Sequence, residues 1–361
     1  MTKVAVLGAN GFIGTRIVEM FALNQWADVC PVVRDYAGLA RSSRFDLDGR
    51  VANAFDQQAL ESAFQGCDIV VHAVAGDIKT ILGTLAPTYQ AAQKAGVRRF
   101  IYLSSGSVHG QAPQPSTDEN SALSTNQHLP YNNAKVRAEQ TLSRLRNQGN
   151  VELVMLRPGI VFGPRSSWVT HFADDLLAGK AALLNRGRGI CNSIYVDNLV
   201  HAIYLSATQP NIDREVFLLG EKECVTWADL YRPITAALGY EFEDIAEGIV
   251  STQRESWFER LEPIRVSRTV QRLLSVVPHR FKLAAFRAYE TILRYDTIAS
   301  TSMQEEKQIS IPFEMGMLYS CSYKLPHKKA TQILRYDPPV SFQEACRRTV
   351  AWLDFAGYPI K

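Results

Sequence analysis

The chain begins almost directly with VAVLGANGFIG at residues 4–14, and the fold can be predicted outward from there. Four apolar residues predict a buried strand, and glycines follow at once, before a segment with helical spacing at residues 12–24. Gly8 permits a tight turn, Gly11 lets the backbone approach a pyrophosphate, and Gly14 allows a helix to pack closely on the strand. The N–H groups and the positive dipole end of the helix favour phosphate. The predicted cofactor contacts are Gly8, Asn10, Gly11, Phe12, Ile13 and Gly14.

Beyond this turn, short apolar runs alternate with amphipathic segments. Such alternation predicts a parallel sheet covered on both faces, and right-handed crossovers make it a doubly wound α/β (Rossmann) fold. A polar stretch with several prolines follows the fifth strand, and we expect it to form a loop above the carboxyl ends of the strands. The expected strands are 4–7, 29–33, 51–54, 68–74, 99–103 and 151–156, the expected helices 12–24, 56–65, 88–94 and 131–148, and the expected loop 106–129.

The expected division of the chain is unequal. Residues 1–164 form a dinucleotide-binding domain to which 193–220 return, and 165–192 and 221–361 form a smaller substrate-binding region. Within the latter, 263–294 is basic and apolar, without an acidic residue before Glu290. Two interpretations stay open for this segment: helices with their apolar face on the core, or a peripheral membrane contact or cover over an anionic or lipid-linked substrate.

Composition excludes several other classes of protein. With 361 residues, 46 % of them hydrophobic, the chain can bury a large core, and a net charge of +3 gives no electrostatic case for nucleic acid. The six cysteines form no CxxC pair and have no neighbouring histidine cluster, so we expect free buried thiols and no metal site. No signal-peptide pattern and no apolar run of about 18 residues is found, so we expect a cytoplasmic protein.

The end of the second strand indicates which nicotinamide cofactor is preferred. An acidic residue there would bond the ribose 2′-hydroxyl of NAD, but Val33 cannot. Arg34 can instead pair with a 2′-phosphate through its guanidinium fork. Asp35 argues the other way, because its carboxylate would repel phosphate. The sequence therefore favours NADP(H), with NAD(H) as the alternative.

Tyr131 and Lys135 are the expected acid–base pair. Residues four apart share a helix face, so the phenol and the ammonium would project into the same site. A free tyrosine has a pKa of about 10, and a nearby Lys⁺ and the positive nicotinamide ring lower it towards neutral pH. A serine at the end of the fifth strand would bond the substrate oxygen. Ser105 is the first choice, with Ser104 and Ser107 as alternatives.

With these residues in place, the chain resembles the extended short-chain dehydrogenase/reductase superfamily, in its NAD-dependent epimerase/dehydratase group. The resemblance covers about residues 1–240 and rests on GANGFIG at 8–14, VVHAVAG at 70–76, YLSSGSVHG at 102–110, YNNAK at 131–135, LRPGIVFGP at 156–164 and YVDN at 195–198.

The resemblance implies roles for individual residues. Ser105, Tyr131 and Lys135 match the catalytic residues of the family, and Asn53 stands where an adenine-contacting residue is usual. A homodimer through the helices near Tyr131 would be usual for the superfamily. The remaining implied cofactor contacts are Ala73, Val74, Ala75, Pro158, Ile160 and Val161.

Departures from the family pattern limit the substrate. Gly106-Ser107 replaces the Asp-Glu pair of 4,6-dehydratases, so dehydration is not expected. Ile160 stands where epimerases often carry a substrate-contacting Asn, and residues 191–193 lack the Arg that often grips a diphosphate. Residues 32–34 resemble NADP-dependent ketone reductases of the dihydroflavonol reductase type.

Three hypotheses about function remain. The first is an oxidoreductase or epimerase acting on a sugar-nucleotide-like carbinol, and the second is an NADPH-dependent ketone reductase or 3β-hydroxysteroid-dehydrogenase-like enzyme for an apolar or lipid-linked substrate. The third, a non-catalytic NADPH sensor, is disfavoured because the Tyr–Lys pair is intact. His109 is a candidate second acid–base group for epimerisation. Candidate phosphate contacts are Arg165, Arg186 and Arg188.

Overall fold

The computed structural model describes residues 1–251 and 309–361. The chain divides into two compact units. The basic apolar segment predicted at 263–294 lies outside the described residues. The first unit comprises Met1–Ser166, Cys191–Val225 and Ser322–Ala345, and the second comprises Ser167–Ile190, Thr226–Cys321 and Cys346–Lys361.

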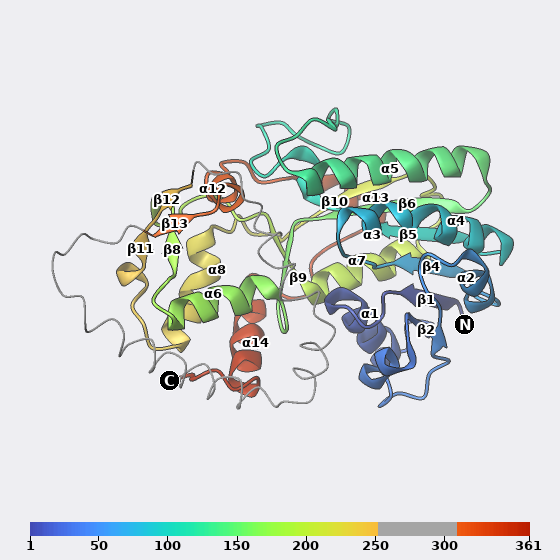
Figure 1. The fold of residues 1–361 in the computed structure, drawn as a ribbon, viewed down its shortest axis with the longest axis horizontal. Coiled ribbons are helices and arrows are strands. Elements are labelled where there is room, and N and C mark those ends of the chain that lie inside the picture. Colours follow the sequence, from blue (N-terminus) through green and yellow to red (C-terminus); the bar gives the residue numbers. More distant parts are fainter. Residues whose placement is uncertain (252–308) are drawn as a thin grey trace. The chain divides into compact units, whose positions relative to one another are not determined.

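A seven-stranded sheet organises the first unit, in the order β10-β6-β5-β4-β1-β2-β3 (Figure 1). Every neighbouring pair is parallel, which confirms the predicted doubly wound α/β fold. The chain runs from β1 outwards to β3 and then returns to the other side of β1, so the strand order reverses between β1 and β4, where such folds bind ligands. The strands are β1 (Lys3–Leu7), β2 (Asp28–Val33), β3 (Arg50–Val51), β4 (Ile69–His72), β5 (Arg99–Leu103), β6 (Glu152–Pro158) and β10 (Val216–Leu219).

Helices cover both faces of this sheet, and each face has its own apolar core (Figure 1). Side chains alternate between the faces of a strand, so Val4 and Val6 enter one core whereas Ala5 and Leu7 enter the other. The first core contains residues of α1 (Phe12–Leu23), α7 (Val196–Thr208) and α13 (Lys328–Leu334), and the second of α2 (Gln57–Ala63), α3 (Ile78–Gly83), α4 (Leu85–Lys94) and α5 (Pro130–Gln148).

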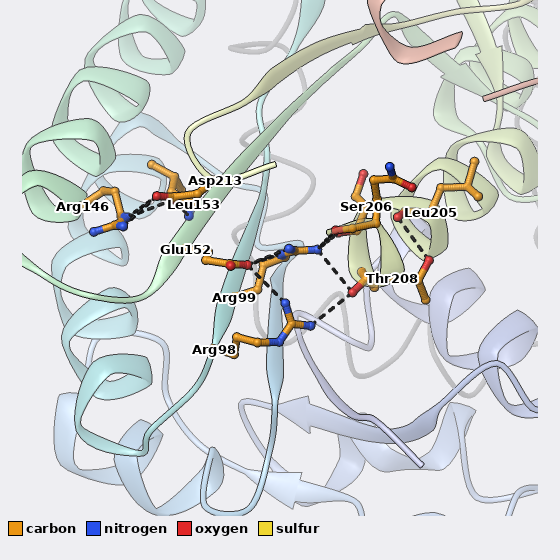
Figure 2. Close-up of polar contacts among 11 residues, drawn as sticks. Arg98, Arg99, Arg146, Glu152, Leu153, Leu205, Ser206, Thr208 and Asp213 are labelled. Atoms are coloured by element: carbon orange, nitrogen blue, oxygen red, sulfur yellow. Dashed lines mark hydrogen bonds and ion pairs between the residues drawn. The ribbon is translucent and has the colours of Figure 1, made fainter. Parts of the chain in front are cut away.

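A polar cluster fixes the amino-terminal end of the sheet. Arg99 is 1 % exposed and its guanidinium donates to Glu152 Oε2 at 2.7 Å (Figure 2). It also donates to the carbonyl oxygens of Ser206 and Gln209 at the end of α7, both at 2.7 Å. A cation at a helix carboxyl end satisfies carbonyl groups that the helix cannot bond. The buried charge therefore joins β5, β6 and α7 at the end of the sheet away from the glycine turn.

Some predicted elements differ from the observed ones. β3 ends at Val51 and not at residue 54, because Asn53 accepts a hydrogen bond from the Phe55 amide and turns the chain. β4 ends at His72, two residues earlier than predicted, and α3 was not predicted. The segment with α13 packs in the first unit, whereas the sequence-based division assigned it to residues 221–361. The remaining short elements of this unit are η1 (Tyr36–Arg41), η2 (Gly106–His109) and the parallel pair β7 (Ile160–Phe162) and β9 (Ser193–Tyr195).

The second unit is built around aromatic side chains. The rings of Phe172 and Tyr231 stack with centroids 3.7 Å apart, and Trp227 is fully buried beside Tyr231. Across residues 1–251 and 309–361, we find no helix with the length and apolar character that a membrane crossing needs. The elements are α6 (Ser167–Leu177), β8 (Ala182–Leu183), η3 (Asn185–Gly187), α8 (Trp227–Ala237), η4 (Phe242–Asp244), β11 (Ala246–Glu247), β12 (Ile249–Val250), β13 (Ser310–Ile311), α12 (Phe313–Tyr319) and α14 (Phe342–Phe355), whose first residues belong to the first unit.

Candidate active site

The glycine turn after β1 leaves no room for side chains at two positions. Gly8 has a φ of +87°, and a Cβ there would lie 2.8 Å from the carbonyl oxygen of Ala73, which follows β4. A Cβ at Gly14 would lie 2.2 Å from the carbonyl oxygen of Gly8. No side chain caps α1 at Gly11, so the first amide groups of the helix stay available to a ligand. This cradle fits the pyrophosphate of a dinucleotide, at the reversal of strand order.

Two arginines lie in the segment after β2, and one of them contacts this turn. Arg34 is 81 % exposed, and Arg41 donates to the backbone oxygen of Asn10 in the glycine turn at 2.7 Å. Asp35 uses a carboxylate oxygen to accept from the Gly38 amide at the start of η1. The neighbouring Arg44 is held by Glu19 on α1. Arg41 thus contacts the predicted phosphate loop directly, which sequence spacing alone did not indicate.

The other predicted cofactor contacts lie at or just beyond strand ends. Ala73, Val74 and Ala75 follow β4, and Ala73 lies against Gly8. Pro158 is the last residue of β6, and Ile160 and Val161 begin β7. Asn53 lies beyond β3 and is exposed, with its side-chain oxygen bonded to the Phe55 amide.

Tyr131 and Lys135 lie one turn apart near the start of α5. Pro130 occupies the first turn, where its missing N–H has no cost. The Lys135 nitrogen lies 6.0 Å from the Tyr131 ring centroid and donates to the carbonyl oxygen of Leu103 at 2.9 Å. Burial lowers the pKa of Lys135 to about 8, and Glu139 opposes this shift. The ammonium therefore sits between α5 and the end of β5, where the third predicted partner follows.

The serines after β5 have different surroundings. Ser104 is buried and its hydroxyl donates to Glu139 at 2.5 Å, on the face of α5 one turn beyond Lys135. Ser105 is half-buried, and its oxygen accepts from the Ser107 amide at 3.1 Å, at the start of η2. Because the Ser104 hydroxyl is already bonded to Glu139, Ser105 stays the first choice for contacting substrate, with Ser107 as the alternative.

A buried ion pair supports this side of the site. Arg157 on β6 donates to both carboxylate oxygens of Glu139, at 3.0 and 2.7 Å, and each side chain is 4 % exposed. Arg157 also lies 3.0 Å from His109 Nε2. Because a guanidinium can only donate, His109 accepts there, and burial and Arg157 together lower its pKa to about 4. His109 is therefore neutral and bonded to Arg157, and its role as a second acid–base group stays a hypothesis.

The polar loop before α5 is tied to the first turn of that helix. The Gln127 amide donates to Asn133 Oδ1 at 2.8 Å, and Asn133 Nδ2 donates to the Gln127 carbonyl at 2.9 Å. Gln127 Nε2 donates to the Val108 carbonyl at 2.8 Å. Asn132 Nδ2 also donates to Gln127 Oε1, at 3.0 Å. The two asparagines between Tyr131 and Lys135 thus help to hold the loop against η2.

The three arginines considered as phosphate contacts are not equivalent. Arg165 belongs to the first unit, and Arg186 and Arg188 belong to the second. Arg186 donates to the Glu243 carbonyl at 3.0 Å and lies 3.8 Å from the Glu247 carboxylate.

A family model and curated relatives both match this chain. The model of the NAD dependent epimerase/dehydratase family matches residues 4–220. A UDP-glucose 4-epimerase of Vibrio cholerae is 28 % identical over 65 % of this chain and 76 % of its own. An Escherichia coli O157:H7 N-acetyl-alpha-D-glucosaminyl-diphospho-ditrans,octacis-undecaprenol 4-epimerase is 28 % identical over 56 % of this chain and 62 % of its own.

The solved structures show the same fold. UDP-glucose 4-epimerase of Thermotoga maritima, in a crystal structure with UDP-glucose, has a TM-score of 0.68 and 19 % identity, covering 98 % of this chain and 99 % of that one. The match to the E. coli relative spans less than two thirds of that protein's length.

Proposed function

Since the chain belongs to the NAD-dependent epimerase/dehydratase family, we propose that it moves hydride between a nicotinamide cofactor and a hydroxyl- or carbonyl-bearing carbon of a diphosphate-linked sugar. The observation that carries this proposal is the Tyr131–Lys135 pair at the end of β5, in the same unit as a glycine turn that fits a pyrophosphate. A bound nicotinamide supplies the hydride donor or acceptor.

Tyr131 is the proposed acid–base. When the sugar carbinol loses hydride, its hydroxyl proton passes to the phenolate of Tyr131, and the reverse step returns it. Lys135 keeps a positive charge close to the phenol and holds the cofactor ribose. The charge favours phenolate, which brings the tyrosine closer to working pH. Ser105 donates its hydroxyl hydrogen to the substrate oxygen and stabilises the charge that develops there.

NADP(H) is the proposed cofactor, with NAD(H) as the alternative. Two guanidinium groups, Arg34 and Arg41, belong to the segment that follows β2, and Arg41 touches the glycine turn. The carboxylate that would argue for NAD, Asp35, is occupied in capping η1. Arg34 is exposed and lies 3.9 Å from the Asp35 carboxylate, and a 2′-phosphate would give both guanidinium groups an anionic partner.

The substrate class is inferred from relatives. Two of them are named as epimerases of a UDP-linked and of a lipid-diphosphate-linked sugar, and both substrates join a sugar carbinol to a diphosphate. The second unit holds a cavity of about 420 Å³, whose lining includes the aromatic side chains Trp168, Phe172, Tyr231 and Tyr319 and the charged side chains Asp174, Asp175 and Lys180. The aromatic part of this lining is the observation that favours the second candidate, a reductase or dehydrogenase for an apolar or lipid-linked substrate.

A substrate panel separates the two candidates. Purified protein is mixed with NADP⁺ or NAD⁺, or with the reduced forms, and with UDP-sugars, a polyprenyl-diphosphate-sugar, and steroid or flavonoid alcohols and ketones. Epimer formation or a change in cofactor absorbance is followed, together with thermal shift. We expect turnover with at least one diphosphate-linked sugar. Turnover restricted to the steroid or flavonoid compounds would support the second candidate instead, and no cofactor-dependent response with any compound would refute both.

A further inference from the structure

Lys135 has a second side-chain partner, on the strand that leads to the predicted catalytic serine. Its ammonium donates to the hydroxyl oxygen of Tyr102 on β5 at 3.3 Å, besides its bond to the Leu103 carbonyl at 2.9 Å. The same ammonium lies 5.0 Å from the centroid of the Tyr102 ring. Tyr102 is 1 % exposed, so water does not compete for this contact. The tyrosine therefore offers Lys135 both a lone pair and the negative face of a ring.

The neighbouring His72 does not help to hold the charge on Lys135. His72 on β4 pairs in register with Tyr102, and its ring lies 5.6 Å from the Tyr102 ring. Thr84 donates its hydroxyl hydrogen to the Thr80 carbonyl, so His72 Nε2 carries a hydrogen and donates to Thr84. Burial and the Lys135 charge lower the pKa of His72 to about 3, so the imidazole is neutral.

In the described part of the chain, few charged and titratable groups face Lys135. On its own helix they are Tyr131, whose ring is 6.0 Å away, and Glu139, which is paired with Arg157. On the strands they are Tyr102 and His72. A buried ammonium needs polar partners to keep its proton, and the two bonds from Lys135 to the end of β5 supply them.

We propose that Tyr102 is a positioning residue, whose hydroxyl holds the Lys135 ammonium charged and in place beside Tyr131 at the carboxyl end of β5. The inference rests on the proposed function, since Lys135 is taken to act on the cofactor ribose and on Tyr131. Among residues 1–251 and 309–361, removing the hydroxyl leaves the Leu103 carbonyl as the one hydrogen-bond acceptor of Lys135. The charged form then loses a stabilising bond, and the proton is released at lower pH.

The test compares Tyr102→Phe with Tyr89→Phe, a matched control. Tyr89 on α4 is also 1 % exposed, and its hydroxyl donates to the Val151 carbonyl at 2.8 Å, away from Lys135. Phenylalanine fills the volume of either ring, so both variants are expected to fold, and thermal unfolding checks this. Protein labelled with ¹³C at lysine Cε is titrated by NMR without cofactor, and Lys135→Arg identifies the signal. We expect Tyr102→Phe to lower the midpoint of Lys135 by about one pH unit, and Tyr89→Phe to leave it unchanged.

A second readout follows cofactor binding. Fluorescence titration with NADPH and NADH is repeated from pH 6 to 10, and we expect the affinity of Tyr102→Phe to fall at lower pH than that of the wild type. An unchanged NMR midpoint in Tyr102→Phe overturns the positioning role, whatever the cofactor does. If the wild type binds neither nucleotide, the proposed function fails, and the NMR titration still decides whether Tyr102 holds the ammonium.

Discussion

The ammonium nitrogen of Lys135 lies 6.0 Å from the ring centroid of Tyr131, one helical turn away on α5. The pair lies where α5 passes the end of β5, since Lys135 bonds the Leu103 carbonyl. Glu139 lies one turn further along the same face of α5 and is paired with Arg157 on β6. The proposed chemistry depends on this row of a phenol, a cation and a buried anion on one helix face.

The glycine turn gives a prediction that separates folding from binding. Gly14→Ala puts a Cβ 2.2 Å from the Gly8 carbonyl oxygen, so we expect a loss of about 1–3 kcal/mol of unfolding free energy. Gly11→Ala meets the same oxygen at 3.3 Å and should cost less than about 1 kcal/mol, but should weaken cofactor binding at least about tenfold by blocking the pyrophosphate. Urea unfolding and NADPH fluorescence measure the two effects. Equal stability of both variants would contradict this account of the turn.

Cofactor preference can be tested at the end of β2. Arg34→Ala and Arg41→Ala should each weaken binding of 2′,5′-ADP by about tenfold and leave 5′-ADP within about twofold. Arg44→Ala is the matched control, because its guanidinium is already held by Glu19. Isothermal titration calorimetry gives the affinities. If wild-type protein binds both nucleotides equally, the NADP(H) preference is wrong.

Acid should destabilise the protein through the buried His109. The pKa of His109 falls from the usual 6.5 to about 4 on folding, so the unfolded chain binds the proton more readily. Stability present above pH 6.5 is therefore lost as the pH falls towards 4, by up to about 1.4 kcal/mol per pH unit. His109→Gln, which can still accept from Arg157, should show a shallower decline. Urea unfolding at pH 7 and pH 5 measures it, and identical pH dependence in both proteins would rule out a neutral buried His109.

The cluster in Figure 2 predicts an asymmetry between adjacent arginines. Arg99→Met removes a buried charge that holds Glu152 and the end of α7, and should cost about 3–5 kcal/mol. Arg98→Met removes a half-exposed partner of the same carboxylate and should cost less than about 1 kcal/mol. Chemical denaturation of both variants compares them. Similar losses would mean that burial does not set the strength of these contacts.

Much of the fold could be predicted because its signals are local. The strand–turn–helix at residues 4–14, the strand at 99–103 and the helix from Tyr131 each follow from a short run of sequence. β3 was predicted too long, because the side chain of Asn53 bonds the Phe55 amide, and apolar pattern does not report such a turn. Pro31, awkward for an inner strand, is accommodated because β3 pairs with β2 only from Val32 onwards.

The site was harder to predict where it depends on contacts between distant segments. Tyr102 reads as an ordinary strand residue, and only the packing of α5 on β5 brings its hydroxyl to Lys135. The sequence indicates only that His109 lies in a loop. Its contact with Arg157, 48 residues later, is visible in the structure alone. Arg41 follows an exposed turn, and its bond to Asn10 requires the folded loop. No sequence spacing encodes these three contacts.

Tyr131→Phe tests the central claim most directly. The variant keeps the ring beside Lys135 and loses only the hydroxyl that is proposed to carry the proton. With any substrate that the wild type converts, we expect turnover to fall by at least about a hundredfold, while the NADPH dissociation constant stays within about twofold. Turnover near the wild-type rate would show that another group carries the proton, and the proposed role of the Tyr131–Lys135 pair would be wrong.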